Sequence, residues 1–188
     1  MKKILILVTG CLFFIACNDE KKEDNKMDDG NKSTMTSDDK KPASVLLDLS
    51  SADPLKKSFA AFARADVDAM TADYDDNVRY TWSNGDSLIG KKAITDYYKG
   101  RWKLIDSVTV SNEIVLPVQV NESQQPAVVP TGKWVLYWAM LSVKYKNGKK
   151  INFWMHNTNH MNDAGKIDFV GQYLDRHQII EATKDLMK

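Results

Sequence analysis

The apolar positions after residue 50 follow a helical spacing at first and a strand-like spacing later. Asp53 and Pro54 are typical of a helix N-cap and first helical position, so we expect a helix to begin there. A break near Ala65–Asp66 separates it from a short second helix, and a third helix is predicted over residues 90–102. The inward faces are expected to consist of Leu55, Phe59 and Phe62, of Val67, Met70 and Tyr74, and of Ile94, Tyr98 and Trp102.

The later segments have the period of strands. Apolar residues alternate with polar ones over residues 78–82, before a turn at residues 83–86. A longer run of even positions follows: Val108, Val110, Ile114, Leu116, Val118 and Val120. Residues 133–145 are apolar at nearly every position, so both faces of that strand should be covered. Asn147–Gly148 has the composition of a two-residue hairpin turn. Helices followed by antiparallel strands indicate an α+β domain.

The hairpin register decides which side chains of residues 153–176 share a face. A two-residue turn at Asn147–Gly148 pairs Trp138 with Asn157, and a four-residue turn at 162–165 pairs Asn159 with Asp168. One predicted face holds Trp134, Leu136, Trp138, Met140, Met155, Asn157, Asn159, Asp168, Val170 and Gln172. The other holds Val135, Tyr137, Leu141, Trp154, His156, Thr158, His160, Phe169 and Tyr173. A three-residue turn with Gly165 left-handed would slip the second pairing and reverse the side that Asp168 faces.

The N-terminus has the pattern of an export signal. Two lysines precede an apolar run, residues 4–16, that is too short to span a bilayer comfortably. Ordinary cleavage after Ala16 would leave Phe14 at the −3 position, where a small residue is needed. The sequence FIAC instead resembles the lipobox of bacterial lipoproteins. This resemblance implies a signal peptide over residues 1–16 and fatty acyl chains on Cys17, which would anchor the protein to a membrane.

The segment after the signal is expected to be a tether. Residues 17–50 begin with the lipidated Cys17 and are rich in charged and polar residues, a composition typical of disorder; the folded domain is expected over residues 51–188. With Cys11 in the signal, no thiol remains for a disulfide, a nucleophile or a metal. The net charge of +1 gives no electrostatic case for nucleic acid. We expect a lipid anchor in the cell envelope of a Gram-negative bacterium, with the outer membrane favoured and surface display left open.

Three stretches of the domain, ADVDAMTADYDDNVRY, GKKAITDYY and MNDAGKIDFVGQYLD, resemble the nuclear transport factor 2-like superfamily. Its SnoaL-like cyclases and ketosteroid isomerases are the most similar in pattern, and the resemblance covers residues 53 to about 182. It implies a curved antiparallel sheet wrapped around N-terminal helices, with a conical pocket on the concave face. The isomerase positions for the oxyanion-hole acid, the base and the tyrosine fall at Asn157, Trp82 and Ser58. An indole cannot abstract a proton, so the resemblance argues for the fold and against that chemistry.

The predicted ligand site lies on the asparagine-bearing face. Its candidate residues are Tyr80, Trp82, Trp138, Met155, Asn157, Asn159, Asp168 and Gln172. The acidic residue that SnoaL-like cyclases carry near Gln172 is absent. Asp168 is the one weak candidate for a catalytic base, and a hydrogen-bonded structural role is its alternative. His156 and His160 would lie ~13 Å apart on one strand, too far to share a metal ion. No cofactor motif is present.

Three functions remain open. The favoured one is a membrane-anchored module that binds a small apolar or amphipathic ligand. The first alternative is a SnoaL-like lyase, isomerase or hydrolase that uses Asp168 as base and Asn157 as donor without a cofactor. The second is a protein-interaction domain that acts through the convex face. An aromatic-rich sheet face is also expected to form a homodimer, because it would otherwise be an unusually large exposed patch. The residues expected there are Tyr137, Leu141, Trp154, His156 and Phe169.

Overall fold

The computed structural model describes residues 41–122 and 130–187, in which one sheet packs against helices. The sheet has seven strands in the order β1-β4-β5-β6-β7-β2-β3. Neighbouring strands run antiparallel, except that β2 and β7 run parallel. The strands are β1 Ser44–Leu46, β2 Tyr74–Trp82, β3 Ser87–Ile89, β4 Ile105–Val120, β5 Gly132–Tyr145, β6 Lys150–Met161 and β7 Ile167–Tyr173. The helices are η1 Leu49–Ala52, α1 Asp53–Ala63, α2 Val67–Met70, α3 Lys91–Trp102 and α4 Arg176–Thr183. This is the predicted α+β architecture.

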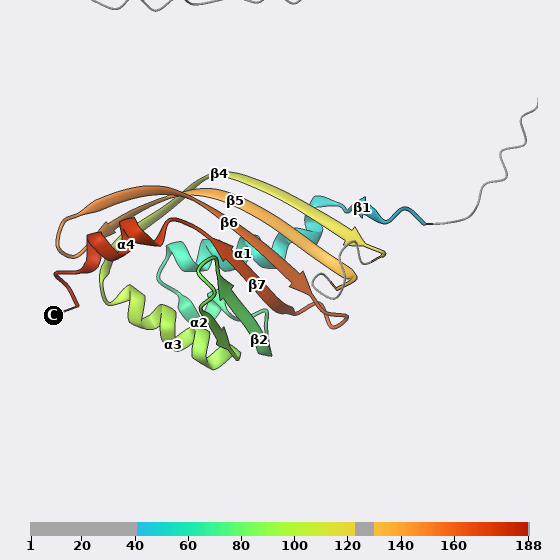
Figure 1. The fold of residues 1–188 in the computed structure, drawn as a ribbon, viewed down its shortest axis with the longest axis horizontal. Coiled ribbons are helices and arrows are strands. Elements are labelled where there is room, and N and C mark those ends of the chain that lie inside the picture. The colour runs from blue at the N-terminus through green and yellow to red at the C-terminus, as the bar shows by residue number, and fades with distance from the viewer. Residues whose placement is uncertain (1–40, 123–129, 188) are drawn as a thin grey trace, which may run out of the picture. The chain divides into compact units, whose positions relative to one another are not determined.

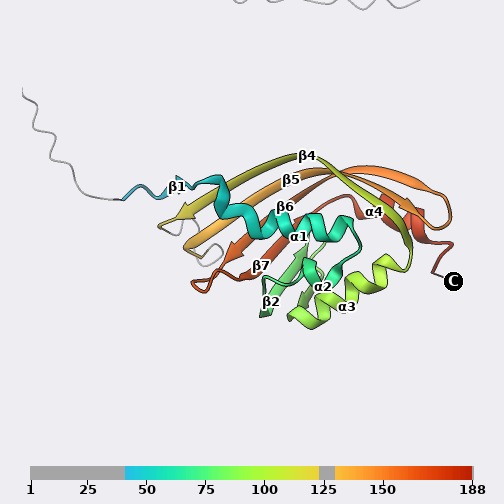
Figure 2. The ribbon, with the colours of Figure 1, turned by 180° about the vertical axis from the view of Figure 1, so that it is seen from behind.

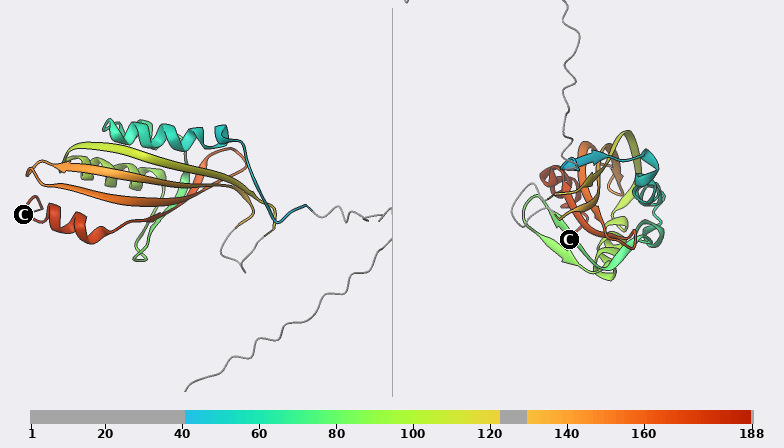
Figure 3. Two further views of the ribbon diagram at one scale, coloured as in Figure 1. Left: turned by 90° about the horizontal axis from the view of Figure 1, so that it is seen from above. Right: turned by 90° about the vertical axis from the view of Figure 1, so that its right-hand side faces the viewer.

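The long strands β4, β5 and β6 arch over the helices, which therefore cover the concave face (Figure 1). Seen from behind, α1 runs along the sheet (Figure 2). From above, α1 and α4 lie at opposite margins of the strands (Figure 3). Phe59 of α1 stacks on Tyr137 of β5 with ring centroids 4.2 Å apart and an interplanar angle of 11°. This contact fixes α1 to the middle of the concave face.

The helices begin and end close to the predicted positions. Asp53 is the first residue of α1 rather than its N-cap, which is Ala52. The helical conformation is interrupted at Ala65, whose φ is 62°. The Asp66 carboxylate accepts the Ala69 N–H at 3.0 Å and caps α2. Tyr74 was expected on this second helix, but it begins β2 because it pairs with β7 there.

Four short elements were not expected: β1, η1, β3 and α4. Strand β1 forms within the stretch predicted as tether, because Ser44–Leu46 pair with the free edge of β4 at Val118–Val120. Helix α4 follows Asp175, whose carboxylate accepts the His177 N–H at 2.9 Å. Cys17, the predicted signal peptide and the tether up to residue 40 lie outside the described residues. Within the described ranges, no helix is long and apolar enough to cross a bilayer.

The predicted β5–β6 register is wrong by one residue. The loop between Tyr145 and Lys149 has three residues, and it is closed by the Gly148 N–H, which donates to the Tyr145 carbonyl at 2.9 Å. Gly148 has φ +84°, the left-handed conformation that such a loop requires. Trp138 therefore pairs with His156, not with Asn157. Because side chains alternate across a strand, this slip moves every even-numbered residue of β5 to the face opposite the predicted one.

Two further irregularities change the faces of β4 and β7. A bulge at Asn112, whose φ is 53°, reverses the alternation along β4. Val108 and Val110 thus face the helices, whereas Ile114 pairs with Trp138 on the convex side. Between β6 and β7 the expected four-residue turn is wrong: the turn has three residues, 163–165, with Gly165 left-handed at φ +73°, and this slip reverses the side that Asp168 faces. A shift between His160 and Met161 then returns Val170 and Gln172 to the concave side. The expectation that both faces of residues 133–145 are covered holds in full for the concave face; on the convex face Trp134 is buried, whereas Leu136, Trp138 and Met140 are half-buried.

Candidate functional site

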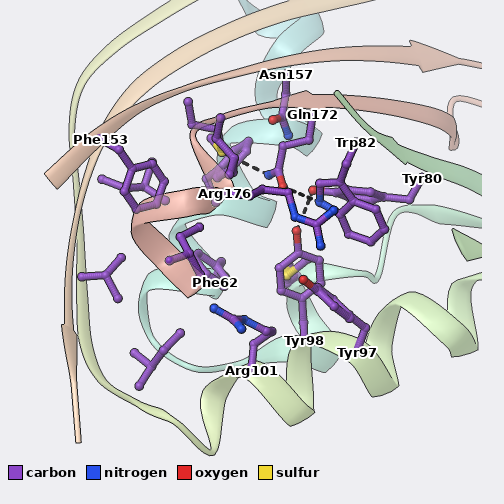
Figure 4. Close-up of a pocket in the computed structure, with 18 of the residues that line it drawn as sticks. Phe62, Tyr80, Trp82, Tyr97, Tyr98, Arg101, Phe153, Asn157, Gln172 and Arg176 are labelled. Carbon is purple, nitrogen blue, oxygen red and sulfur yellow. Dashed lines mark hydrogen bonds between the residues drawn. The ribbon is translucent and has the colours of Figure 1, made fainter. Parts of the chain in front are cut away.

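A cavity of about 120 Å³ lies between the concave face and the helices, and it is open to solvent on one side. Its walls come from the sheet, from α1 and α3, and from the C-terminal segment that leads into α4 (Figure 4). They include Phe59, Phe62, Tyr80, Trp82, Tyr98 and Phe153. An engineered cavity of ~150 Å³ lined by apolar side chains holds benzene, so this cavity suits a ligand with about one ring.

Most polar groups in the wall are already paired. The Trp82 indole N–H donates to Gln172 Oε1 at 3.0 Å, and Gln172 Nε2 donates to the sulfur of Met155 at 3.2 Å. The hydroxyls of Tyr80 and Tyr98 are 2.6 Å apart. These contacts join β2, β6, β7 and α3, so they hold the aromatic wall in one arrangement (Figure 4).

Asn157 is the exception. It lies on β6 between Tyr137 of β5 and Gln172 of β7. Its side chain lines the cavity and is only 2% exposed, yet its Oδ1 has no hydrogen-bond partner. A buried amide oxygen without a partner costs ~1–3 kcal/mol. This position therefore favours a bound molecule that supplies a polar group.

Two arginines reach the cavity, Arg101 from α3 and Arg176 from α4. Arg176 donates from Nη1 to Asp86 Oδ2 at 2.7 Å and to Asn84 Oδ1 at 2.8 Å, and its guanidinium lies 5.4 Å from the Trp82 ring centroid. Arg101 lies beside Tyr145. Burial raises the pKa of the Tyr145 hydroxyl, and the guanidinium partly offsets that rise.

The other ionisable groups in the wall are phenols that stay protonated. Burial raises the pKa of Tyr74 to about 12, and it also raises the pKa values of Tyr80 and Tyr98. Among the described residues that line the cavity there is no Asp, Glu, His, Lys or Cys. The lining thus offers shape, stacking and hydrogen bonds, and it offers no group that exchanges a proton near neutral pH.

Five of the eight predicted site residues line this cavity: Tyr80, Trp82, Met155, Asn157 and Gln172. Asn159 also faces the helices, but its amide donates to the Val135 carbonyl at 3.0 Å and it is not part of the lining. Trp138 was predicted in the site and is on the opposite face, where it stacks on His156 with centroids 4.4 Å apart. The three-residue loop at 146–148 is the cause.

Asp168 was also expected in the pocket and lies elsewhere. Its Oδ1 is 2.6 Å from Nδ1 of His160, whose Nε2 is 3.1 Å from the Thr131 carbonyl oxygen. His160 in turn contacts Trp134, with ring centroids 5.0 Å apart. Both imidazole nitrogens are engaged, and the pair lies on the convex side. The expected arrangement of Asp168 as base beside Asn157 is not formed, because the turn after β6 has three residues, 163–165, with Gly165 left-handed, the alternative that reverses the side Asp168 faces.

The three positions compared with the isomerase pattern all lie at this cavity: Ser58, Trp82 and Asn157. The Ser58 hydroxyl donates to the Met70 carbonyl at 2.7 Å, so it serves the contact between α1 and α2. Of the two histidines considered for a metal, His156 is stacked between Trp138 and Tyr173. Within residues 41–122 and 130–187, no group of three His, Cys, Asp or Glu side chains could hold a metal ion.

Arg101, Arg176 and the part of the cavity wall that α4 supplies were not predicted from the sequence. Arg176, Ile179 and Ile180 come from that helix, and Asp175 as its N-cap was a usable signal. Arg101 follows the predicted inward residues Ile94 and Tyr98 by seven and three positions, which places it on the same helical face. The sequence pattern alone could therefore have indicated both helix α4 and Arg101 as part of the wall.

The fold and the cavity define an α+β cone with an aromatic interior, and comparisons with known proteins agree. A family model described as "SnoaL-like domain" matches residues 55–169, and the chain belongs to this family. Similar solved structures share 12–18% of residues with this chain and so support the fold alone. A nuclear transport factor 2-like protein of unknown function from Burkholderia pseudomallei K96243 aligns with TM-score 0.54 and 15% identity over 70% of this chain and 95% of its own. A proposed polyketide cyclase from Pseudomonas putida KT2440 aligns with TM-score 0.56 and 16% identity, over 70% of this chain and 96% of its own.

An LEH-like epoxide hydrolase from M. tuberculosis aligns with TM-score 0.53 and 13% identity, over 73% of this chain and 92% of its own. No curated protein matches the chain. The nuclear transport factor 2-like fold predicted from the sequence is therefore confirmed. The names of these structures span different activities, as expected of a fold that hosts many functions.

Proposed function

We propose that this protein binds a compact, mainly apolar small molecule in the aromatic cavity and does not transform it. The observation that carries the proposal is the composition of the wall. Aromatic rings surround a space of about 120 Å³, Asn157 Oδ1 has no hydrogen-bond partner, and the described lining contains no carboxylate, imidazole or thiol. General acid–base catalysis near neutral pH is carried mostly by such groups, placed within hydrogen-bond reach of the substrate. Ligand recognition needs only shape and a few directed polar contacts.

The alternative is a SnoaL-like lyase, isomerase or hydrolase, and family membership alone supports it. The residue expected to act as base, Asp168, is held by His160 on the other side of the sheet. Binding is therefore the function that the site supports best.

The test uses Trp82, the one tryptophan in the described lining. Its indole N–H signal should shift when methyl 4-hydroxybenzoate is titrated into the ¹⁵N-labelled purified protein. The signal is assigned by its loss in Trp82→Phe, and Trp138 on the opposite face is the internal control. No shift of the Trp82 signal at millimolar probe, or equal shifts for both tryptophans, would overturn the proposal.

We further propose that Cys17 carries the lipid anchor and that the protein resides in the envelope of a Gram-negative bacterium, with the outer membrane favoured. The support is the FIAC sequence after an apolar run that is too short to span a bilayer. Cys17→Ser should abolish fatty-acid labelling and leave the precursor uncleaved. Normal processing of this variant would contradict the anchor.

The same proposal includes a homodimer formed through the convex face, with a corrected set of residues. Tyr137 and Leu141 were expected there, but they are buried beneath the helices. Trp154, His156 and Phe169 remain, and Trp138 and Ile114 join them. Ile114 is 55% exposed and Trp154 is 49% exposed, which is unusual for such large apolar side chains on one sheet face.

A further inference from the structure

The charges around the cavity are unbalanced. Arg101 and Arg176 are the cationic side chains in its described lining, and no acidic side chain lies among them. Arg176 is compensated from outside the lining by Asp86, at 2.7 Å. Other cations of the domain form ion pairs, such as Lys99 with Asp68 at 2.7 Å. Within the described residues, Arg101 forms no such pair. Arg101 thus presents a guanidinium to the cavity without a carboxylate partner.

The position of Arg101 has two structural explanations, its contact with the Tyr145 hydroxyl and its place at the end of a helix. It lies in the last turn of α3, where a cation interacts favourably with the helix dipole. Lys99 lies in the same turn and satisfies that requirement from the surface, paired with Asp68. The helix end therefore does not require a second cation that is half-buried against the phenol of Tyr145. An anionic ligand group would use that cation.

A second observation comes from the sheet side of the cavity. Asn157 Oδ1 is unpartnered in a side chain that is 2% exposed. Figure 4 shows Asn157 projecting from the sheet and Arg101 from α3, with the rings of Phe62, Tyr98 and Phe153 between and beside them. The cavity thus has a cation at one wall, an unsatisfied amide at the other, and aromatic surfaces around the space that separates them.

We propose that the ligand is a small ring-bearing carboxylate with a hydroxyl group. Its ring packs among the aromatic side chains, its carboxylate pairs with Arg101, and its hydroxyl meets Asn157. This inference rests on the proposed binding function and adds the chemical class of the ligand. Guanidinium and carboxylate form paired, charge-assisted hydrogen bonds, which are stronger than neutral ones. A hydroxyl is the smallest group that can donate to Oδ1, and it also accepts from the amide if the amide is rotated.

Three matched probes test this class by isothermal titration calorimetry on the purified protein: 4-hydroxybenzoate, its methyl ester, and benzoate. The acid should bind at least about tenfold more tightly than the ester, as expected for a charge-assisted pair at a half-buried site. Benzoate lacks the hydroxyl and should bind about fivefold more weakly than 4-hydroxybenzoate. Raising the salt concentration should weaken the binding of the acids and leave that of the ester unchanged.

Variants assign the preference to Arg101. Arg101→Met should remove the advantage of the acid over the ester and leave the binding of the ester within about twofold. Arg101→Lys should keep part of the advantage, because the charge remains and the paired geometry is lost. Arg79→Met is the matched control, since Arg79 is exposed on β2 and lies outside the lining; this variant should bind all three probes like the parent.

The outcomes separate the two proposals. Equal affinity for acid and ester, or an acid preference that survives Arg101→Met, overturns the carboxylate inference while binding of the ester keeps the proposed function. Absence of binding by all three probes at millimolar concentration overturns both. Loss of ester binding in Arg101→Met would mean that Arg101 only supports the wall, and it would also overturn the inference.

Discussion

The contact between Trp82 and Gln172 can be tested by replacing each partner with an apolar residue. Trp82 is 8% exposed, and its indole N–H donates to Gln172 Oε1 at 3.0 Å. The side chains come from β2 and β7, the parallel pair of the sheet. Gln172 is anchored on its other side by Met155, at 3.2 Å. Trp82→Phe keeps an aromatic ring in this wall and removes the donor.

The expected cost of Trp82→Phe is the sum of three terms. Leaving the buried Gln172 Oε1 without a donor costs ~1–3 kcal/mol. The smaller ring leaves a void at least the size of a methyl group, which costs ~1 kcal/mol. Weakening the contact with the Arg176 guanidinium adds ~0.5–1 kcal/mol. We expect a loss of about 2.5–5 kcal/mol in the free energy of unfolding, which corresponds to roughly 5–20 °C in Tm for a domain of this size.

Gln172→Met should cost ~1–3 kcal/mol, because it leaves the indole N–H unsatisfied. In the double variant the indole N–H and Gln172 Oε1 are removed together, so neither is left without the other. The combined loss should therefore be smaller than the sum of the single losses by ~1–2 kcal/mol, a coupling typical of residues in direct contact. Urea unfolding followed by far-ultraviolet circular dichroism gives all four free energies without relying on tryptophan emission. The m-value should stay constant across the series.

Trp138→Phe is the matched control. Trp138 is half-buried on the convex face, and no hydrogen bond from its indole enters this network. Its loss should stay below ~1 kcal/mol, and it should be additive with Gln172→Met. Additive free energies for Trp82→Phe and Gln172→Met would refute the reasoning, since they would mean that the two side chains do not interact in the folded protein.

Three further predictions concern stability and assembly. Gly132→Ala should destabilise the protein by ~2–3 kcal/mol, because its φ is +124° and a Cβ would lie 2.7 Å from His160 Nε2. Gly148→Ala is the control: its φ is +84° but no atom lies within 4 Å of an added Cβ, so it should cost only ~1 kcal/mol. Equal losses of the two variants in urea unfolding would contradict the clash at Gly132. Stability should fall above pH 10, because the pKa of Tyr74 is raised to about 12 in the folded protein and the unfolded chain therefore loses this proton first. Each such tyrosine removes ~1.4 kcal/mol of stability per pH unit between its unfolded and folded pKa values. A flat stability profile from pH 9 to 11.5 would show that these phenols are not buried. Trp154→Glu should give monomers in sedimentation, whereas Leu49→Glu, also exposed but off the convex sheet face, should leave the dimer intact; a parent protein that is monomeric at high micromolar concentration would refute the dimer.

The sequence by itself determined the long helices and strands and much of the cavity wall. The spacing of Leu55, Phe59 and Phe62 specified the buried face of α1, and the alternation of Val78, Tyr80 and Trp82 specified the inward face of β2. These patterns are local: a helix or strand exposes one face because its own residues repeat at 3.6 or 2. The same patterns, with the resemblance, sufficed to predict the SnoaL-like fold that the family match confirms.

Only the tertiary structure decided which strand residues face the cavity. The Lys146–Gly148 loop has one residue more than predicted, and this difference moved Trp138 to the convex face and Tyr137 beneath α1. The bulge at Asn112 reversed which residues of β4 face the helices, and the three-residue turn at 163–165 took Asp168 out of the site. A slip of one residue inverts a whole strand, whereas the local free-energy difference between a two-residue and a three-residue loop is small. The choice is therefore made by the packing of distant residues, such as Phe59 on Tyr137, and not by the loop sequence.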